Sequence, residues 1–182
     1  MFNLITLDGY FEGTNKWDIA WHQVDDEINT FSIEQLNKAG GLIFGRVTYL
    51  GMASYWPSLN AIRDDPQVAG LMNSIQKYVF SNTLDKAEWK NTELLKGDAA
   101  AELRKLRQQG GKDLFIFGSA DLSSTFTKNN LIDEYRLMVN PIILGLGNPL
   151  FKNTGEMLKL KLVDTKPFGN GNVLLYYQPN GK

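Results

Sequence analysis

The sequence contains no cysteine and a single histidine, His22, among its 182 residues. Without cysteine the chain has no disulfide, no thiol nucleophile and no thiolate metal site. One histidine does not form a metal cluster by itself, and no serine lies in the G-x-S-x-G pattern of a common hydrolase triad. We therefore expect no metal site, and neither a metalloenzyme nor a serine hydrolase is expected.

The chain also lacks an excess of charge and a long hydrophobic run. The 19 lysine and arginine residues balance 20 acidic residues, giving a formal net charge of −1, so no basic surface for nucleic acid is expected. No apolar stretch approaches the roughly 18 residues of a membrane helix. The first basic residue is Lys16, which does not suit a signal peptide. We expect a cytoplasmic protein with neither a membrane nor a nucleic-acid partner.

Hydrophobic residues make up 43% and charged residues 21% of the chain, which is usual for a soluble globular protein. This length favours one domain over residues 1–182, and no linker, repeat or low-complexity tract divides it.

A short apolar run over residues 114–117 is typical of a strand that is covered on both faces. Small residues follow it, and Ser119 is predicted to N-cap a helix that continues through Phe126. Such a helix start presents free backbone N–H groups and a positive dipole end, which together bind anions. The alternative is a purely structural β–α turn.

The same arrangement recurs twice upstream. Residues 42–44 form a second apolar run, followed by Gly45, Arg46 and Thr48 at the start of a short helix. Residues 78–80 form a third run with a polar exit, Ser81-Asn82-Thr83. If these strands are neighbours, their exits share one rim, where open α/β sheets bind ligands. A ligand with several phosphates would suit the two helix starts and the hydroxyl-rich turn. The guanidinium of Arg46 could donate two hydrogen bonds to one of these phosphates.

Helices are expected from Asp25, Asp65 and Asp98, each of which suits an N-cap position. At the N-terminus we expect a strand over residues 2–7 and a long loop over 10–21. The last third of the chain differs, because apolar and polar residues alternate from Tyr135 onward. That alternation predicts antiparallel strands with one solvent-facing side, added to a β/α sheet. No G-x-x-x-x-G-K-[ST] phosphate loop is present.

Taken in order, the motifs resemble the dihydrofolate reductase-like superfamily over residues 2–178. The resemblance is strongest to the reductase domain of bifunctional riboflavin-biosynthesis deaminase–reductases and its stand-alone bacterial relatives. The motifs that carry it are LDGYF at 7–11, LIFGRVTY at 42–49 with Met52 and Trp56, KYVFSNTL at 77–84, FGSA at 117–120, LIDEY at 131–135 and NPIILG at 140–145.

The resemblance implies an α/β/α fold in three layers, with a mostly parallel central sheet and an antiparallel C-terminal hairpin. It also implies NADPH as cofactor, with Arg46 facing the 2′-phosphate and the 118–120 turn at the pyrophosphate. The cofactor-binding residues that it implies are Gly45, Arg46, Thr48, Ser81, Asn82, Thr83, Gly118, Ser119, Ala120, Asp121 and Leu122. On the substrate side it implies Asp8, Trp17, Tyr49 and Trp56, although packing is an alternative role for each tryptophan.

The activity implied by this resemblance is an NADPH-dependent reductase, similar to 5-amino-6-(5-phosphoribosylamino)uracil reductase, acting on a small heterocycle. No catalytic proton donor is assigned, because Asp25 and Asp26 suit helix capping. The zinc deaminase half of the bifunctional enzymes is absent from this sequence. A non-catalytic NADP(H)-binding or sensor protein remains an alternative, as does a structural phosphate-binding module. A homodimer is expected from the apolar C-terminal third, through Tyr135, Leu158, Tyr176 and Tyr177.

Overall fold

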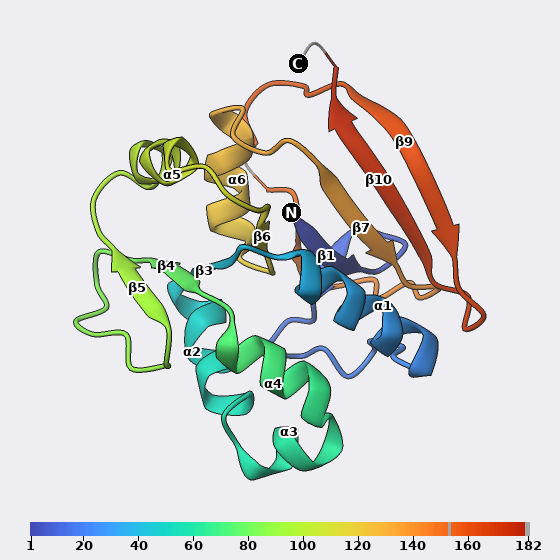
Figure 1. Cartoon of the computed structure of the whole chain (residues 1–182). Coiled ribbons are helices and arrows are strands. Elements are labelled where there is room, and N and C mark those ends of the chain that lie inside the picture. Colours follow the sequence, from blue (N-terminus) through green and yellow to red (C-terminus); the bar gives the residue numbers. More distant parts are fainter. Residues whose placement is uncertain (153, 181–182) are drawn as a thin grey trace.

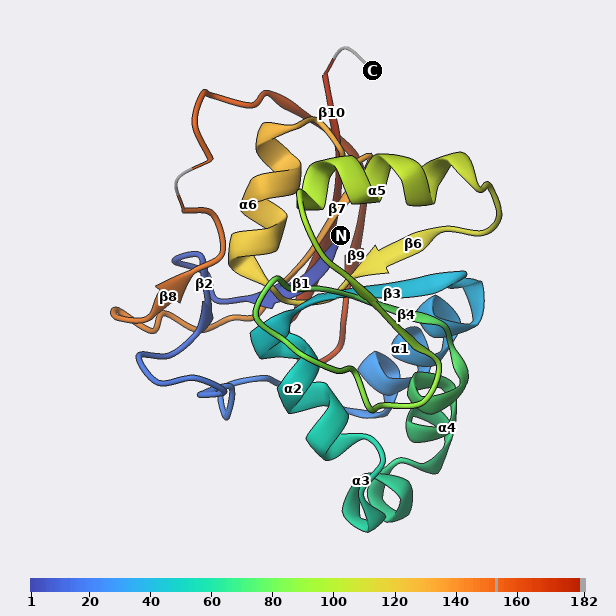
Figure 2. The same ribbon diagram turned by 90° about the vertical axis from the view of Figure 1, so that its left-hand side faces the viewer.

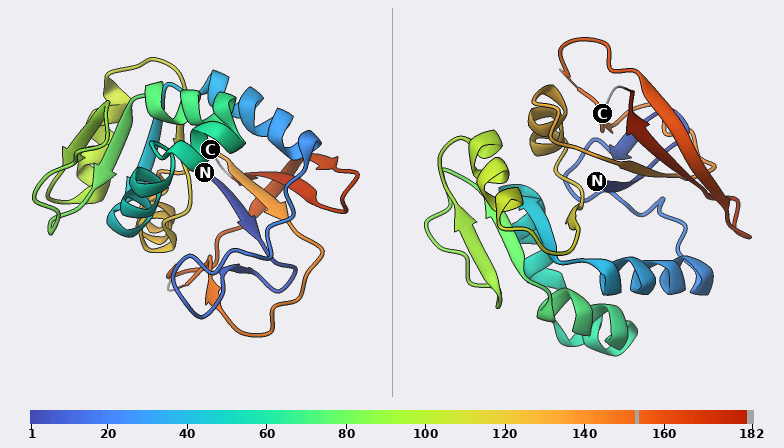
Figure 3. Two further views of the ribbon diagram at one scale, coloured as in Figure 1. Left: turned by 90° about the horizontal axis from the view of Figure 1, so that it is seen from below. Right: turned by 45° about the horizontal axis from the view of Figure 1, so that its top comes forward.

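The computed structural model describes residues 1–152 and 154–180. Eight of its ten strands form two four-stranded sheets that a single parallel bridge, between Phe2 and Phe117, joins edge to edge. The first sheet has the order β5-β4-β3-β6 and is parallel throughout, with β3 (Gly41–Gly45), β4 (Lys77–Phe80), β5 (Thr92–Leu95) and β6 (Leu114–Ile116). The second has the order β1-β7-β10-β9, with β1 (Phe2–Ile5), β7 (Tyr135–Val139), β9 (Leu160–Pro167) and β10 (Val173–Pro179). Figure 3 shows the two groups of strands on either side of the junction.

Helices cover both faces of these sheets, as Figures 1 and 2 show. One face carries α5 (Ala99–Gln108) and α6 (Ala120–Lys128). The other carries α1 (Asp26–Lys38), α2 (Arg46–Tyr55), α3 (Leu59–Asp64) and α4 (Pro66–Ser74). The predicted α/β/α architecture, mostly parallel with an antiparallel C-terminal hairpin, is confirmed.

The helices pack on the sheets through separate apolar clusters. Under α5 and α6, Leu103 and Phe126 pack with Ile43 and Ile116 of the sheet. Burial of such side chains contributes about 1.5–3 kcal/mol each. Because β3 contributes side chains to both of its faces, its sequence is a continuous apolar run rather than an alternating one.

The predicted helix starts at Asp25, Asp65 and Asp98 are confirmed. Each aspartate is an N-cap whose carboxylate accepts a hydrogen bond from a backbone N–H three residues later. Pro66 occupies the first turn of α4, where a missing N–H costs nothing.

The predicted loop over residues 10–21 is wrong in its first part. Residues Tyr10–Glu12 form β2, which pairs antiparallel with the short β8 (Asn148–Pro149). The first strand is also shorter than predicted, since β1 ends at Ile5. The β2 pattern was not visible locally because its partner lies more than a hundred residues further along the chain.

The expectation of a solvent-facing side for β7 is also wrong. Met138, on the side of this strand opposite Tyr135 and Leu137, is 0% exposed, and it packs with Phe31 of α1. The reason is that β7 is an interior strand, parallel to β1 and antiparallel to β10. The antiparallel pairing that the alternation predicted occurs at β7–β10 and β10–β9.

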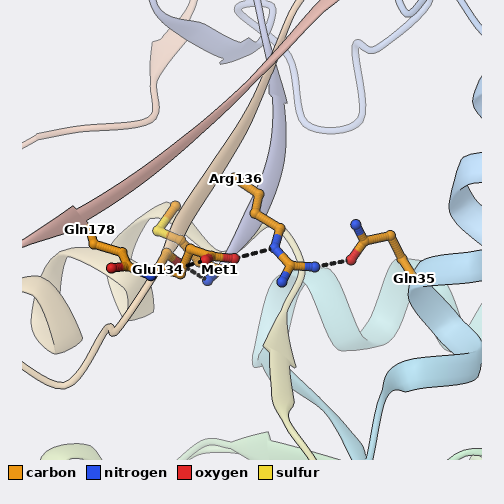
Figure 4. Close-up of polar contacts among 5 residues, drawn as sticks. All are labelled: Met1, Gln35, Glu134, Arg136 and Gln178. Carbon is orange, nitrogen blue, oxygen red and sulfur yellow. Dashed lines mark hydrogen bonds and ion pairs between the residues drawn. The ribbon is translucent and has the colours of Figure 1, made fainter. Parts of the chain in front are cut away.

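Arg136 of β7 ties this sheet to α1, as Figure 4 shows. Its guanidinium pairs with Glu134 and donates a hydrogen bond to the side-chain oxygen of Gln35. The carbonyl of Glu134 in turn accepts a hydrogen bond of 2.6 Å from the backbone nitrogen of Met1. These contacts hold β1, β7 and α1 in register beside the sheet junction.

Candidate functional site

A cleft of about 640 Å³ lies at the junction between the two sheets. Its walls come from β1, from the exits of β3 and β6, and from the segment between β2 and α1. The exits of β3 and β6 are neighbours because these strands pair in parallel, with β4 next to them. The shared rim that the sequence predicted is therefore present. Nine of the predicted site residues line the cleft: Trp17, Gly45, Arg46, Thr48, Gly118, Ser119, Ala120, Asp121 and Leu122.

Two helices begin at this cleft without a side-chain cap. In the part of the chain that the structure describes, α1, α3, α4 and α5 each have an aspartate or serine side chain on their first turn. At α2 and α6 no side chain accepts from the first N–H groups. Both helices therefore direct uncapped N–H donors and a positive dipole end toward the same space. That arrangement suits an anionic ligand.

The Ser119 hydroxyl does not perform the capping role predicted for it. Its Oγ accepts a hydrogen bond of 2.8 Å from the backbone N–H of Gly45 and donates one of 2.9 Å to Oγ1 of Thr48. The hydroxyl thus joins the start of α6 to the start of α2. Because it is used across the rim, the first N–H groups of α6 remain without a side-chain partner.

The turn before α6 has an unusual backbone. Gly118 and Ser119 both have positive φ, of 61° each. A Cβ on Gly118 would stand 3.1 Å from the Thr48 methyl carbon, so this position requires glycine for its conformation and for its fit. A serine with positive φ is a strained residue, and strain of this kind clusters at ligand sites.

Charged side chains border the outer part of the cleft. Arg46 and Lys16 are exposed on its walls, and no ion pair joins either of them to another described residue. The Lys152 ammonium pairs with Asp121 at 3.0 Å. The carboxylate of Glu12 is held by the Trp17 N–H and by the Asn148 amide. The guanidinium of Arg46 is thus not held by a carboxylate of the described residues.

The predicted residues at the β4 exit lie on the same rim but outside the cleft lining. Ser81 Oγ accepts from the backbone N–H groups of Thr83 and Leu84, which closes a tight turn. The Asn82 side chain both donates to and accepts from Gly97, after β5. Ser81, Asn82 and Thr83 therefore shape the far end of the rim, beyond Arg46.

Trp17 is the one predicted substrate residue that lines the cleft. Its indole rests on Gly51 of α2, where an added Cβ would come 1.9 Å from the ring. It remains 40% exposed, and its backbone has a positive φ of 65°. Trp17 both anchors its segment to α2 and presents a ring edge to the cleft.

The structure places the other three predicted substrate residues elsewhere. Tyr49 is 2% exposed in the core, where its hydroxyl accepts from the Trp89 N–H, so its assignment to the substrate is corrected. Trp56 packs in the same core and hydrogen-bonds the Met52 sulfur. The Asp8 carboxylate accepts from the Thr6 hydroxyl and from the Gly145 and Leu144 N–H groups, and these donors lower its pKa. Asp8 thereby fixes the β1–β2 turn.

Several residues of the cleft were not predicted from the sequence, Asn3 and His22 among them. Asn3 and His22 line it, and each has a buried side-chain nitrogen without a hydrogen-bond partner among the described residues. Burial lowers the pKa of His22 from 6.5 to about 4, so its imidazole is neutral at physiological pH. No sequence signal marks either residue, because only the fold brings them to the cleft.

Among the residues that the structure describes, no three histidine or acidic side chains gather where they could hold a metal ion. The same residues include no helix with the length and apolar character to span a membrane.

A family model and a known protein both match this chain over nearly its whole length. The family model described as the RibD C-terminal domain matches residues 1–174. The uncharacterized protein YyaP of Bacillus subtilis is 32% identical over 177 residues, which cover 97% of this chain and 92% of YyaP.

Two solved structures have the same fold. A putative riboflavin biosynthesis protein from a Shewanella species superposes with a TM-score of 0.78 at 24% identity, covering 98% of this chain and 97% of that one. Dihydrofolate reductase from Enterococcus faecalis, complexed with NADP(H), superposes with a TM-score of 0.66 at 15% identity, covering 98% and 94%.

Proposed function

The chain belongs to the family of the RibD C-terminal domain, and from this premise we propose that it is an NADPH-dependent reductase. The reaction would be hydride transfer to a small heterocyclic substrate, similar to 5-amino-6-(5-phosphoribosylamino)uracil reductase. Members of its fold include a dihydrofolate reductase that binds NADP(H). The family supports an oxidoreductase, and the cofactor and the reaction are our proposal.

The observation that carries the proposal is the pair of uncapped helix starts. The N-termini of α2 and α6 open on one cleft, and the Ser119 hydroxyl is diverted to hold them together. Capping by an ordinary serine, threonine or aspartate would contribute about 1 kcal/mol at each helix. A bound pyrophosphate that accepts hydrogen bonds from the free N–H groups would take the place of both side-chain caps.

The second support is Arg46, the first residue of α2. It is exposed at the cleft and no described acidic side chain pairs with it, so its guanidinium is available to a 2′-phosphate dianion. The cofactor, when bound, supplies the hydride. The chain's own residues would bind and orient the cofactor, and Trp17 would shield the reacting ring from water.

A non-catalytic NADP(H)-binding protein is the second candidate. The observation that favours it concerns His22 and Glu12, two titratable side chains that line the cleft. His22 is neutral because its pKa is lowered to about 4, and the Glu12 carboxylate is held by Trp17 and Asn148. Neither is placed as an evident proton donor.

The test is calorimetric titration of the wild-type protein with NADPH and with NADH. We expect NADPH to bind with a clear preference. Arg46→Ala should weaken NADPH binding by roughly ten- to a hundredfold, since a lost charge-assisted contact costs about 1.5–3 kcal/mol. NADH binding should hardly change, because NADH has no 2′-phosphate.

Arg63→Ala is the matched control, because Arg63 is an exposed arginine of α3 outside the cleft. It should leave both cofactors unaffected. Equal losses for NADPH and NADH in Arg46→Ala would show that Arg46 is structural. Loss of NADPH absorbance with pyrimidine and pterin substrates would then separate a reductase from a binding protein.

A further inference from the structure

The buried amide of Asn3 has no partner. Asn3 lies on β1 and is only 4% exposed, yet its Nδ2 makes no hydrogen bond within the part of the chain that the structure describes. A buried donor left unpaired costs about 1–3 kcal/mol, and such groups are rare in folded proteins. Asn3 also lines the cleft, so a ligand there can reach it.

Asn3 lies on the α6 side of the cleft. Side chains alternate along a strand, and its neighbours Met1 and Ile5 belong to the core under α5 and α6. The parallel bridge between Phe2 and Phe117 sets Asn3 level with Gly118. Asn3 therefore stands across the sheet junction from the turn that begins α6, and it faces the ligand that this turn would hold.

The chemistry around Asn3 favours an uncharged group. Of the cations that line the cleft, Arg46 and Lys16 are on its exposed walls, and Lys152 is paired with Asp121. Asn3 is neutral and deeply buried, next to the partly buried Leu4 and Phe117. Burying a phosphate here would carry a large desolvation cost with no countercharge, whereas a carbonyl oxygen needs only a donor.

We propose that Asn3 Nδ2 donates a hydrogen bond to the carboxamide oxygen of the cofactor's nicotinamide ring. This inference rests on the proposed function and deepens it, because it names the residue that positions the uncharged end of the dinucleotide. The phosphates are then held at the helix starts, and the ring is held at β1 beside Trp17.

The experiment compares two ligands on one variant. NADP⁺ has the nicotinamide, and adenosine 2′,5′-bisphosphate has the adenosine and 2′-phosphate without it. In Asn3→Leu, which is of similar size and has no donor, we expect NADP⁺ affinity to fall roughly tenfold. Affinity for the bisphosphate should stay within about twofold, and the melting temperature of the free protein should be unchanged or higher.

The matched control is Thr92→Val. Thr92 Oγ1 is also buried without a partner among the described residues, but it lies on β5, outside the cleft. This variant should leave both affinities unchanged. If Asn3→Leu does not fold, Asn3→Ala, which adds no atom, is measured in the same way.

Three results would overturn the inference: unchanged NADP⁺ affinity, equal losses for the two ligands, or a melting temperature several degrees lower in the free protein. The last would mean that Asn3 supports the fold. The wild-type titrations separate these results from a failure of the proposed function. If wild-type protein binds neither ligand, the NADPH assignment itself is wrong, and the role of Asn3 falls with it.

Discussion

His22 is held in a neutral state by its surroundings. Its ring packs edge-on against Trp21 with centroids 4.5 Å apart, and its Nε2 is buried without a partner among the described residues. Burial therefore lowers its pKa from 6.5 to about 4, because the imidazolium would lose its hydration. In the unfolded chain the same ring protonates near pH 6.5.

This difference predicts a loss of stability on acidification. Between pH 6.5 and 4 the unfolded state binds a proton that the folded state does not, so the free energy of unfolding falls as the pH falls. The stability that depends on neutral His22 should be fully present above pH 6.5. At pH 5 the free energy of unfolding should be lower by about 2 kcal/mol. Urea unfolding at pH 7 and pH 5 measures this change.

His22→Phe is the comparison, since it keeps a ring and removes the titration. Between pH 7 and pH 5, the free energy of unfolding should fall by about 2 kcal/mol less in the variant than in the wild type. An identical pH dependence in both proteins would mean that the ring of His22 titrates normally in the folded state.

Single residues also show where inference from the sequence ends. The small residues at 118–120 correctly indicated a tight turn into a helix. The partner of the Ser119 hydroxyl could not be inferred, because Gly45 and Thr48 are more than seventy residues away in the chain. For Tyr49 the motif indicated a site residue, but helical geometry turns this side chain into the core while Arg46 faces the cleft.

At the scale of elements, Trp17 fastens the segment between β2 and α1 to α2. Trp17 rests on Gly51, and its backbone N–H donates to Glu12 of β2. A tryptophan stabilises such a contact through the large apolar area that it buries, and segments over a cleft can close on a bound substrate.

We predict that Trp17→Ala lowers turnover, or binding of a heterocycle in the cleft, and leaves NADPH affinity within about threefold, or roughly 0.7 kcal/mol. The reason is that Trp17 lines the cleft on the segment between β2 and α1 and contacts α2 at Gly51, away from the first N–H groups of that helix. Calorimetry with NADPH and a melting curve on this variant are the measurements. A lower melting temperature together with weakened NADPH binding would assign Trp17 to anchoring alone.

The elements that local chemistry specifies were predicted with correct boundaries or nearly so. Asp25, Asp65 and Asp98 marked helix starts because a capping carboxylate acts within three residues. β2, β5 and β8 were missed. These strands have four residues or fewer, and distant pairing stabilises them rather than their own pattern.

At the scale of the whole molecule, β9 is an edge strand. It pairs only with β10 among the described residues, and it exposes Leu162 and Val163 by 48% and 50%. An edge strand presents unpaired backbone groups to which a second copy can pair, and in β9 the exposed apolar pair lies between Lys161 and Asp164. Tyr135, expected at such an interface, cannot contribute because it is 1% exposed in the core.

We therefore predict a homodimer through β9, with twice the 20.5 kDa mass of one chain in light scattering. Val163→Lys should shift the mass to that of one chain, because a charge at the centre of the edge opposes pairing. A wild-type mass of 20.5 kDa at every concentration would contradict the prediction.

Among the described residues, one isolated β-bridge joins the strands of the two sheets. So small a connection could let each sheet unfold separately. The strand ladder between them is weak, but the core under α5 and α6 is not divided. Ile5 and Leu137 of one sheet pack in the same cluster as Ile43 and Ile116 of the other. Phe2 adds an edge-to-face contact with Phe117 at 5.7 Å. Because this shared core cannot open on one side alone, we predict one calorimetric transition, as expected for a single domain.

NADP⁺ at a hundred times its Kd should raise the free energy of unfolding for that transition by about 2.7 kcal/mol. Two transitions, with only one of them shifted by NADP⁺, would show that each sheet folds with its own core.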